Sequence, residues 1–265
     1  MNLYITVFLL FICVFIYLTF WHEVANQIVA EGFDEPIHFL SSDETRDLIS
    51  SNADGYFERF TQNDLRARNA TGVDQYIQGF NCGDFTDSEK DLIADCIAEI
   101  ETIVVKDTTV NWVDSDKFHA IPWKIGLIVD NSYEYGLPHT RIDTILIPKS
   151  YVVTAKTDKK DFINTLIHEK LHVYQKLYPA DFQKYLDHHG FVKHARYGNG
   201  ELASNPDTDE YVYAKKSGLK RVVHCGKYSK GHKPGIKSIV YQPINDAKYD
   251  HPRELAVYNL LENLL

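Results

Sequence analysis

Two histidines four residues apart, with a glutamate directly after the first, form the grouping in this sequence best suited to chemistry. They are His168, Glu169 and His172, in the run DFINTLIHEKLHVYQKLYP. Residues four positions apart lie on one face of a helix, about 5–6 Å from each other, so two imidazoles can reach one ion. Zinc binds imidazole nitrogen at about 2.0–2.1 Å, and catalytic sites keep one coordination position for water. The spacing therefore predicts Zn2+ held by His168 and His172.

Glu169 is predicted to be the catalytic base. It follows His168 by about 100° of helical rotation, so its carboxylate can reach a metal-bound water without ligating the metal. Zinc lowers the pKa of such a water to about 7, and a carboxylate can then take the proton and later pass it to the leaving amine. The alternative is two half-buried histidines and a solvated glutamate, because HExxH matches arise by chance in about a few per hundred sequences of this length.

The helix that carries these residues is expected to begin with Asp161 as N-cap and to end before Pro179. Its apolar residues recur at helical spacing, at positions 162, 163, 166, 167, 171, 174 and 177. Upstream, WKIGLIVD (123–130) and HTRIDTILIP (139–148) are rich in β-branched residues and predict two neighbouring strands. In the second strand one face would hold Thr140, Ile142, Thr144 and Leu146.

The remaining elements complete an α+β domain with a small mixed sheet. Residues 41–102 are mostly helical in pattern, and Thr86 and Glu89 have capping-box spacing before an apolar stripe at 92, 93, 96, 97, 100 and 103. Residues 180–240 read as mixed and loop-rich. The chain ends with HPRELAVYNLLENLL, which predicts a helix with Pro252 at its first position.

Composition and the N-terminal segment limit the partners. The 265 residues carry a formal net charge of -9 and no basic stripe, so nucleic acid is not an expected partner. Leu3 to Trp21 contains no charged residue and is long enough to span a bilayer as a single-pass anchor of undetermined orientation; a cleaved signal peptide is the alternative. The predicted organisation is a transmembrane anchor at 1–22, a linker and helical region at 23–104, and a domain at 105–265.

TLIHEKLHVYQ resembles the active-site helix of the zincin metallopeptidases, and HTRIDTILIP resembles the edge strand along which those enzymes bind an extended substrate. The resemblance covers roughly residues 105–265. It implies a zincin-like fold, a peptide or protein substrate, zinc ligation by His168 and His172, and Glu169 as general base.

The third ligand decides the subclass. Metzincins would have Gly at 175 and His at 178, where this chain has Gln175 and Tyr178. Gluzincins supply a glutamate from a later helix, and Glu254 in HPRELAVYN could take that role. It shares one side of the terminal helix with residues 257, 258, 261 and 265, and a carboxylate on such an apolar stripe needs a partner.

Other roles for Glu254 and other third ligands stay open. As the third residue of its helix Glu254 could bond back to the cap, and it lies 82 positions after His172, which is long for a gluzincin. The competing ligands are Glu201, Asp207, Asp209, His188, His189 and His194. Candidates for stabilising the transition state, or for orienting a ligand, are Tyr211, Tyr213, His224 and His251.

The sequence as a whole predicts a membrane-anchored, gluzincin-like zinc metallopeptidase. The alternative is a catalytically inactive membrane or envelope protein with a structural or vestigial zincin domain. A deformylase-like hydrolase would need a cysteine ligand in a particular motif, which neither Cys82 nor Cys96 provides. These two cysteines are the nearest pair for a disulfide outside the apolar segment, and reduced, buried cysteines are the alternative.

Overall fold

The structure is a computed structural model that describes residues 37–196, 201–217, 220–229, 233–242 and 251–264. The chain divides into two units, and the second runs from Phe39 to the C-terminus. The anchor predicted at 1–22 lies outside the described residues. Among the helices that are described, none combines the length and apolar character needed to cross a membrane.

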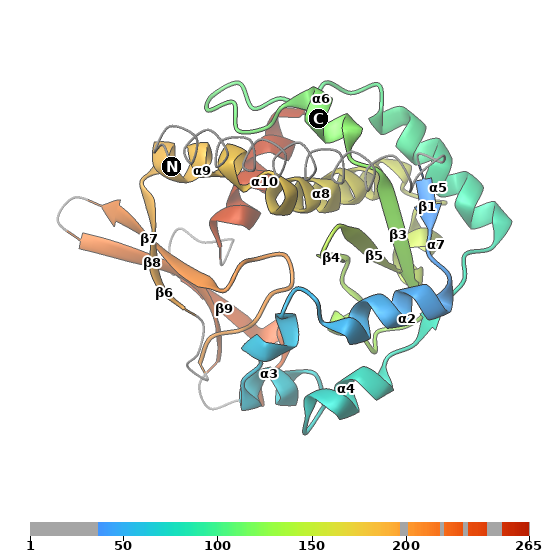
Figure 1. The fold of residues 1–265 in the computed structure, drawn as a ribbon, viewed down its shortest axis with the longest axis horizontal. Coiled ribbons are helices and arrows are strands. Elements are labelled where there is room, and N and C mark those ends of the chain that lie inside the picture. The colour runs from blue at the N-terminus through green and yellow to red at the C-terminus, as the bar shows by residue number, and fades with distance from the viewer. Residues whose placement is uncertain (1–36, 197–200, 218–219, 230–232, 243–250, 265) are drawn as a thin grey trace, which may run out of the picture. The chain divides into compact units, whose positions relative to one another are not determined.

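A small mixed sheet confirms the predicted α+β class. Its path runs β1-β3-β5-β4 (Figure 1), and β2 pairs with β3. The strands are β1 (Ile37–Phe39), β2 (Cys82–Gly83), β3 (Trp123–Ile128), β4 (His139–Arg141) and β5 (Thr144–Pro148). The β3 and β5 strands are parallel, with Ile125 opposite Ile145, whereas β4 runs antiparallel to β5. The described part of this sheet therefore has β4 at one edge.

The prediction of one continuous strand at 139–148 is wrong. The chain reverses between β4 and β5 and places Thr140 opposite Ile145. Ile142 lies in the turn with a φ of 55°, a left-handed conformation that is unusual for a β-branched residue. Thr140 consequently shares a face with Ile145, and not with Thr144 and Leu146 as predicted.

Nine α-helices are found in the described residues. They are α2 (Ser42–Ser51), α3 (Gln62–Ala67), α4 (Val73–Gly79), α5 (Asp87–Ile100), α6 (Ser115–Ala120), α7 (Lys149–Thr154), α8 (Lys159–Leu177), α9 (Pro179–His189) and α10 (Pro252–Leu264). The predicted helical region is confirmed in α2 to α5, and the Thr86 N–H donates to Glu89 Oε2 at 3.1 Å, as a capping box requires. The α5 stripe buries Ile93, Cys96, Ile97 and Ile100.

The α8 helix starts earlier than predicted. Asp158, not Asp161, is the N-cap, and its carboxylate accepts the Asp161 N–H at 3.0 Å. Two aspartates three positions apart both satisfy the pattern, and the first one after α7 takes the role. At the other end Tyr178 caps α8, and Pro179 begins α9 as its first residue.

Residues 180–240 hold more regular structure than predicted. A second, antiparallel sheet has the order β6-β7-β8-β9. Its strands are β6 (Phe191–Arg196), β7 (Tyr211–Ser217), β8 (Lys220–Tyr228) and β9 (Ile239–Gln242). In β6 only Phe191 is buried and the next five residues are exposed. Because such strands are rich in Lys, Arg and His, they lack the apolar runs by which strands are recognised in sequence.

The terminal helix begins at Pro252 as predicted, but its buried face shares only Val257 with the expected one. Ala256, Val257 and Leu260 are buried, whereas Tyr258 is 37% exposed. The side of α10 that bears Glu254, Tyr258 and Leu261 lines a cleft instead of the core.

A buried ion pair joins α3 to the turn that precedes β4. Arg68 Nη2 lies 2.7 Å from Glu134 Oε2, and both side chains are at most 5% exposed. The Tyr76 hydroxyl donates to Glu134 Oε1 at 2.9 Å. Glu134 and Tyr135 adopt positive φ values of 44° and 56°, so this network holds a strained turn in place.

The three described cysteines are not joined in a disulfide. Cys96 and Cys225 are buried and Cys82 is half-buried. Of the pair Cys82 and Cys96, only Cys96 is thus the buried, reduced cysteine of the predicted alternative.

Asp181, near the start of α9, gives a testable pH dependence. Its carboxylate accepts from Lys117 at 2.6 Å, Lys184 at 2.7 Å and the Tyr174 hydroxyl at 2.9 Å. These hydrogen bonds, that of Lys117 foremost, lower the pKa of Asp181 to about 2. A pKa below the unfolded value of about 3.9 means that the carboxylate stabilises the fold at neutral pH, and that this contribution fades as pH falls from about 4 to about 2.

Asp181→Asn should therefore lower the unfolding midpoint in urea at pH 7 and have a smaller effect at pH 3. The exposed Asp187→Asn is the matched control on the same helix. An Asp181→Asn deficit that is equally large at both pH values would contradict this account.

Candidate metal centre

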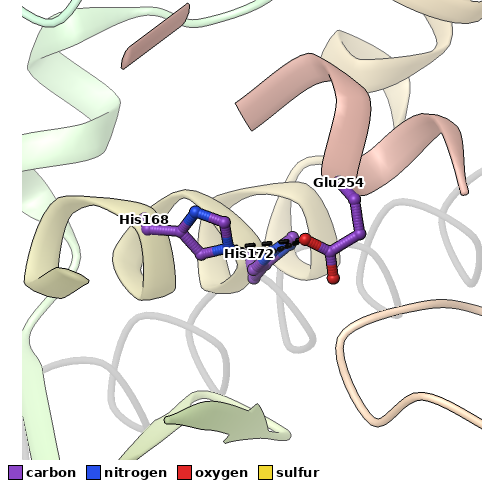
Figure 2. A group of neighbouring side chains, drawn as sticks. All are labelled: His168, His172 and Glu254. Atoms are coloured by element: carbon purple, nitrogen blue, oxygen red, sulfur yellow. Dashed lines mark hydrogen bonds and ion pairs between the residues drawn. The ribbon is translucent and has the colours of Figure 1, made fainter. Parts of the chain in front are cut away.

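Three of the predicted side chains meet at one point. His168 and His172 project from α8, and Glu254 reaches them from the first turn of α10 (Figure 2). The two Nε2 atoms are 3.0 Å apart, and Glu254 Oε2 lies 3.4 Å from His168 Nε2 and 3.3 Å from His172 Nε2. Ligand atoms of a tetrahedral ion with bonds of about 2.0–2.1 Å are about 3.3–3.4 Å apart. The triangle therefore has the size that a tetrahedral metal ion requires.

Gln175, one turn after His172, fixes which nitrogen of that ring faces the centre. Its Nε2 donates to the Arg253 carbonyl at 3.0 Å, which leaves Oε1 as the acceptor for His172 Nδ1, 3.1 Å away. His172 Nδ1 must then carry the proton, and in the neutral ring Nε2 presents a lone pair to Glu254 Oε2. Two facing acceptors need a cation, either a proton or a metal ion, between them.

The pKa values of His172 and Glu254 are shifted because the two side chains face each other. Burial alone would lower the pKa of His172, but the facing Glu254 carboxylate raises it above its usual value. Burial would conversely raise the pKa of Glu254, and the two histidines lower it well below the ordinary range. The carboxylate is thus held ionised beside the imidazoles, which is the protonation state that a metal ligand needs.

Asn205 binds one oxygen of Glu254, so the other oxygen can face the candidate metal centre. Its Nδ2 donates to Glu254 Oε1 at 3.0 Å, while its Oδ1 accepts the Asp207 N–H at 2.9 Å. The second oxygen, Oε2, is the one that faces both histidines. Such hydrogen bonds to the non-ligating atoms of metal ligands orient them.

The loop that contains Asn205 and Asp207 also stabilises the helix that carries Glu254. Asp209 Oδ2 accepts the Tyr213 hydroxyl at 2.7 Å, and Asp209 Oδ1 lies 3.3 Å from His251 Nε2. His251 Nδ1 accepts the Arg253 N–H at 3.1 Å, so it supplies the start of α10 with a hydrogen-bond acceptor. Tyr213 and His251 therefore hold α10 in position and do not line the cleft.

Glu169 is buried next to the three converging groups. It is 4% exposed, and its Oε2 has no hydrogen-bond partner among the described residues. Burial, reinforced by the Asp207 and Glu254 carboxylates, raises its pKa well above the usual value. A carboxylate in such surroundings accepts a proton readily, which is the property of a general base.

A cleft of about 640 Å³ opens onto these groups. Its lining includes His168, Glu169 and Glu254 together with His139 and Asp207. Three exposed apolar side chains, Leu137, Tyr241 and Tyr258, are also part of its wall. The cleft thus combines an apolar surface with a few converging polar groups, as binding sites for small molecules or peptides do.

Several predicted site residues lie elsewhere. Tyr211 and His224 are on β7 and β8 and do not line the cleft. Of the competing third ligands in the described residues, only Asp207 lines the cleft. None of them belongs to the cluster of His168, His172 and Glu254. The competitors that do not line the cleft are Glu201, Asp209, His188, His189 and His194. Sequence reasoning used Gln175 only to exclude a subclass, although its spacing from His172 is a signal. Asn205 and His139 carry no recognisable sequence signal.

Comparison of the chain with protein-family models, with curated proteins and with solved structures found no match. The reading of this site therefore depends on its own geometry. Two imidazole nitrogens and one carboxylate oxygen at these distances fit a tetrahedral divalent ion with one position left for another ligand.

Gln175→Leu tests the orienting role. Removing the partner of a metal-bound histidine typically costs about 10–100-fold in metal affinity. We expect a loss in this range, measured by competition with a chelator, while Gln175→Glu, which still accepts from His172, should lose less. Gln183→Leu, on an exposed surface of α9, is the matched control. Unchanged affinity of Gln175→Leu would refute the role.

Proposed function

We propose that the protein is a zinc-dependent metallopeptidase of the zincin type, gluzincin-like in its third ligand, which hydrolyses peptide bonds. The observation that carries the proposal is the convergence of His168, His172 and Glu254 with Glu169 directly beside them in one cleft. Imidazole and carboxylate ligands in a tetrahedral set suit Zn2+. In this proposal residues 105–265 form the zincin-like domain, and residues 1–22 anchor it to a membrane.

The chain's own residues have distinct roles in the reaction. His168 and His172 hold the ion, and Glu254 completes the set through Oε2 while Asn205 binds its other oxygen. A bound zinc ion supplies Lewis acidity, lowering the pKa of water and polarising a carbonyl. Glu169 takes the proton of the attacking water and delivers it to the amine nitrogen as the C–N bond breaks. Its buried Oε2, which has no hydrogen-bond partner in the described part of the chain, supports this assignment.

The metal is tested first. The purified full chain should contain about one zinc per molecule by elemental analysis, and His168→Ala should lose it. His194→Ala replaces an exposed histidine on β6 and should keep the metal. A wild-type chain that takes up no zinc when reconstituted would overturn the proposal.

Glu169→Gln then separates catalysis from binding. The variant should keep its zinc but lose about 100- to 10,000-fold in kcat, which is the usual contribution of a general base. Hydrolysis would be followed with a quenched fluorescent peptide library. Wild-type turnover in Glu169→Gln would sink the mechanism, and a zinc-loaded wild type without hydrolysis would favour the inactive alternative.

A further inference from the structure

His139 lies on β4 and carries a buried ring nitrogen that the proposed mechanism does not use. The side chain lines the same cleft as Glu169, and the residue is 2% exposed. Its Nδ1 lies 2.9 Å from the Leu137 carbonyl oxygen, which can only accept, so Nδ1 carries the proton. Its Nε2 has no hydrogen-bond partner among the described residues. In the neutral ring this atom is a bare acceptor.

The surroundings keep the ring neutral. Burial lowers the pKa of His139, and this outweighs the nearby Asp207 and Glu134 carboxylates, which raise it, while the Arg141 cation lowers it further. Unpartnered buried acceptors are rare in folded proteins, because they lose their hydrogen bonds to water without replacement. A ligand that donates a hydrogen bond would satisfy Nε2.

The outer edge of β4 is closed to strand addition. Thr140 donates its N–H to Asp207 Oδ1 at 2.7 Å and accepts from Lys176 Nζ at its carbonyl, 2.9 Å away. In an antiparallel pair the N–H and C=O of one residue point to the same side, so both of these groups point away from β5. They are the groups with which an added strand would pair. Asp207 and Lys176 already use them.

Lys176 and Asp207 are a fixed part of this wall. Lys176 Nζ also donates to Thr140 Oγ1 at 2.6 Å and to the Pro206 carbonyl at 3.2 Å, so its three protons are all used. Thr140 Oγ1 donates in turn to Asp207 Oδ1 at 2.7 Å. An extended peptide would have to break this network to pair with β4. The neighbouring His139 Nε2 is free of it.

We propose that His139 Nε2 accepts a hydrogen bond from one main-chain N–H of the bound peptide and so takes over the anchoring that the edge strand cannot provide. This inference rests on the proposed peptidase function. Every residue except proline offers such an N–H, so the contact would tolerate any side chain at that position but reject proline. His139 lines the same cleft as His168 and Glu169, so the contact would lie in the cleft that holds the reacting groups.

The test is an N-methyl scan of a cleaved peptide with the zinc-loaded full chain. Each amide is methylated in turn, and kcat/KM is measured for wild type, His139→Leu and His139→Gln. In wild type, methylation at one position near the scissile bond should lower kcat/KM by about 10-fold or more. In His139→Leu the parent peptide should already be weakened by a similar factor, and methylation at that position should cost nothing further.

Controls separate the possible failures. His139→Gln retains an acceptor and should recover part of the loss, and His194→Leu should behave as wild type in the whole scan. Zinc content is measured for each variant. If His139→Leu does not fold, the contact is still supported when His139→Gln keeps the wild-type kcat/KM for the parent peptide and shows the full methylation penalty. A wild-type scan in which no methylated position lowers kcat/KM overturns the contact.

Binding of the same peptides to zinc-loaded Glu169→Gln, measured by calorimetry, tests His139 apart from turnover. If no peptide is hydrolysed but one methylation still weakens binding, the peptidase proposal fails while the contact holds. If the methylation penalty is undiminished in His139→Leu, the contact is refuted although the enzyme stands.

Discussion

Two imidazole nitrogens and one carboxylate oxygen converge on the same small volume, with the atoms 3.0 to 3.4 Å apart. Acceptors so close repel each other unless a cation lies among them, and without one the surrounding chain has to resist that repulsion. Much of the local structure serves this purpose. Gln175 bonds both His172 and the Arg253 carbonyl, and thereby ties α8 to α10 across the centre.

One loop connects the centre to the rest of the cleft through alternate residues. Asn205 binds Glu254, Asp207 binds Thr140 at the sheet edge, and Asp209 binds the residues that start α10. These residues belong to a turn, in which the Thr208 N–H donates to the Asn205 carbonyl at 3.4 Å, so three side chains close together in the sequence reach the glutamate, the edge strand and the helix start. The centre and the strand beside it are therefore positioned by the same short segment.

The sequence was informative where a feature is local and periodic. Spacing alone placed His168 and His172 on one helix face, and Pro252 marked the first residue of α10. Features that depend on distant contacts were missed. The turn at Ile142 needs a positive φ, which a β-branched residue does not predict. The β6 strand has a polar sequence because only Phe191 is buried, so no apolar pattern marks it as a strand. Asn205 and His139 gain their roles only from side chains far away in the chain.

Lys170 follows Glu169 in the sequence and lies on the side of α8 that faces away from His168 and His172, where it is 1% exposed. Its Nζ lies 4.0 Å from the centre of the Trp123 ring and 3.3 Å from Glu101 Oε1. Contacts of Lys170 on one side of α8 and of Gln175 on the other restrict rotation of the helix about its axis. The two imidazoles are therefore oriented before an ion binds. Ion capture would then involve little loss of chain entropy, and its rate would be governed by dehydration of the ion and not by folding around it.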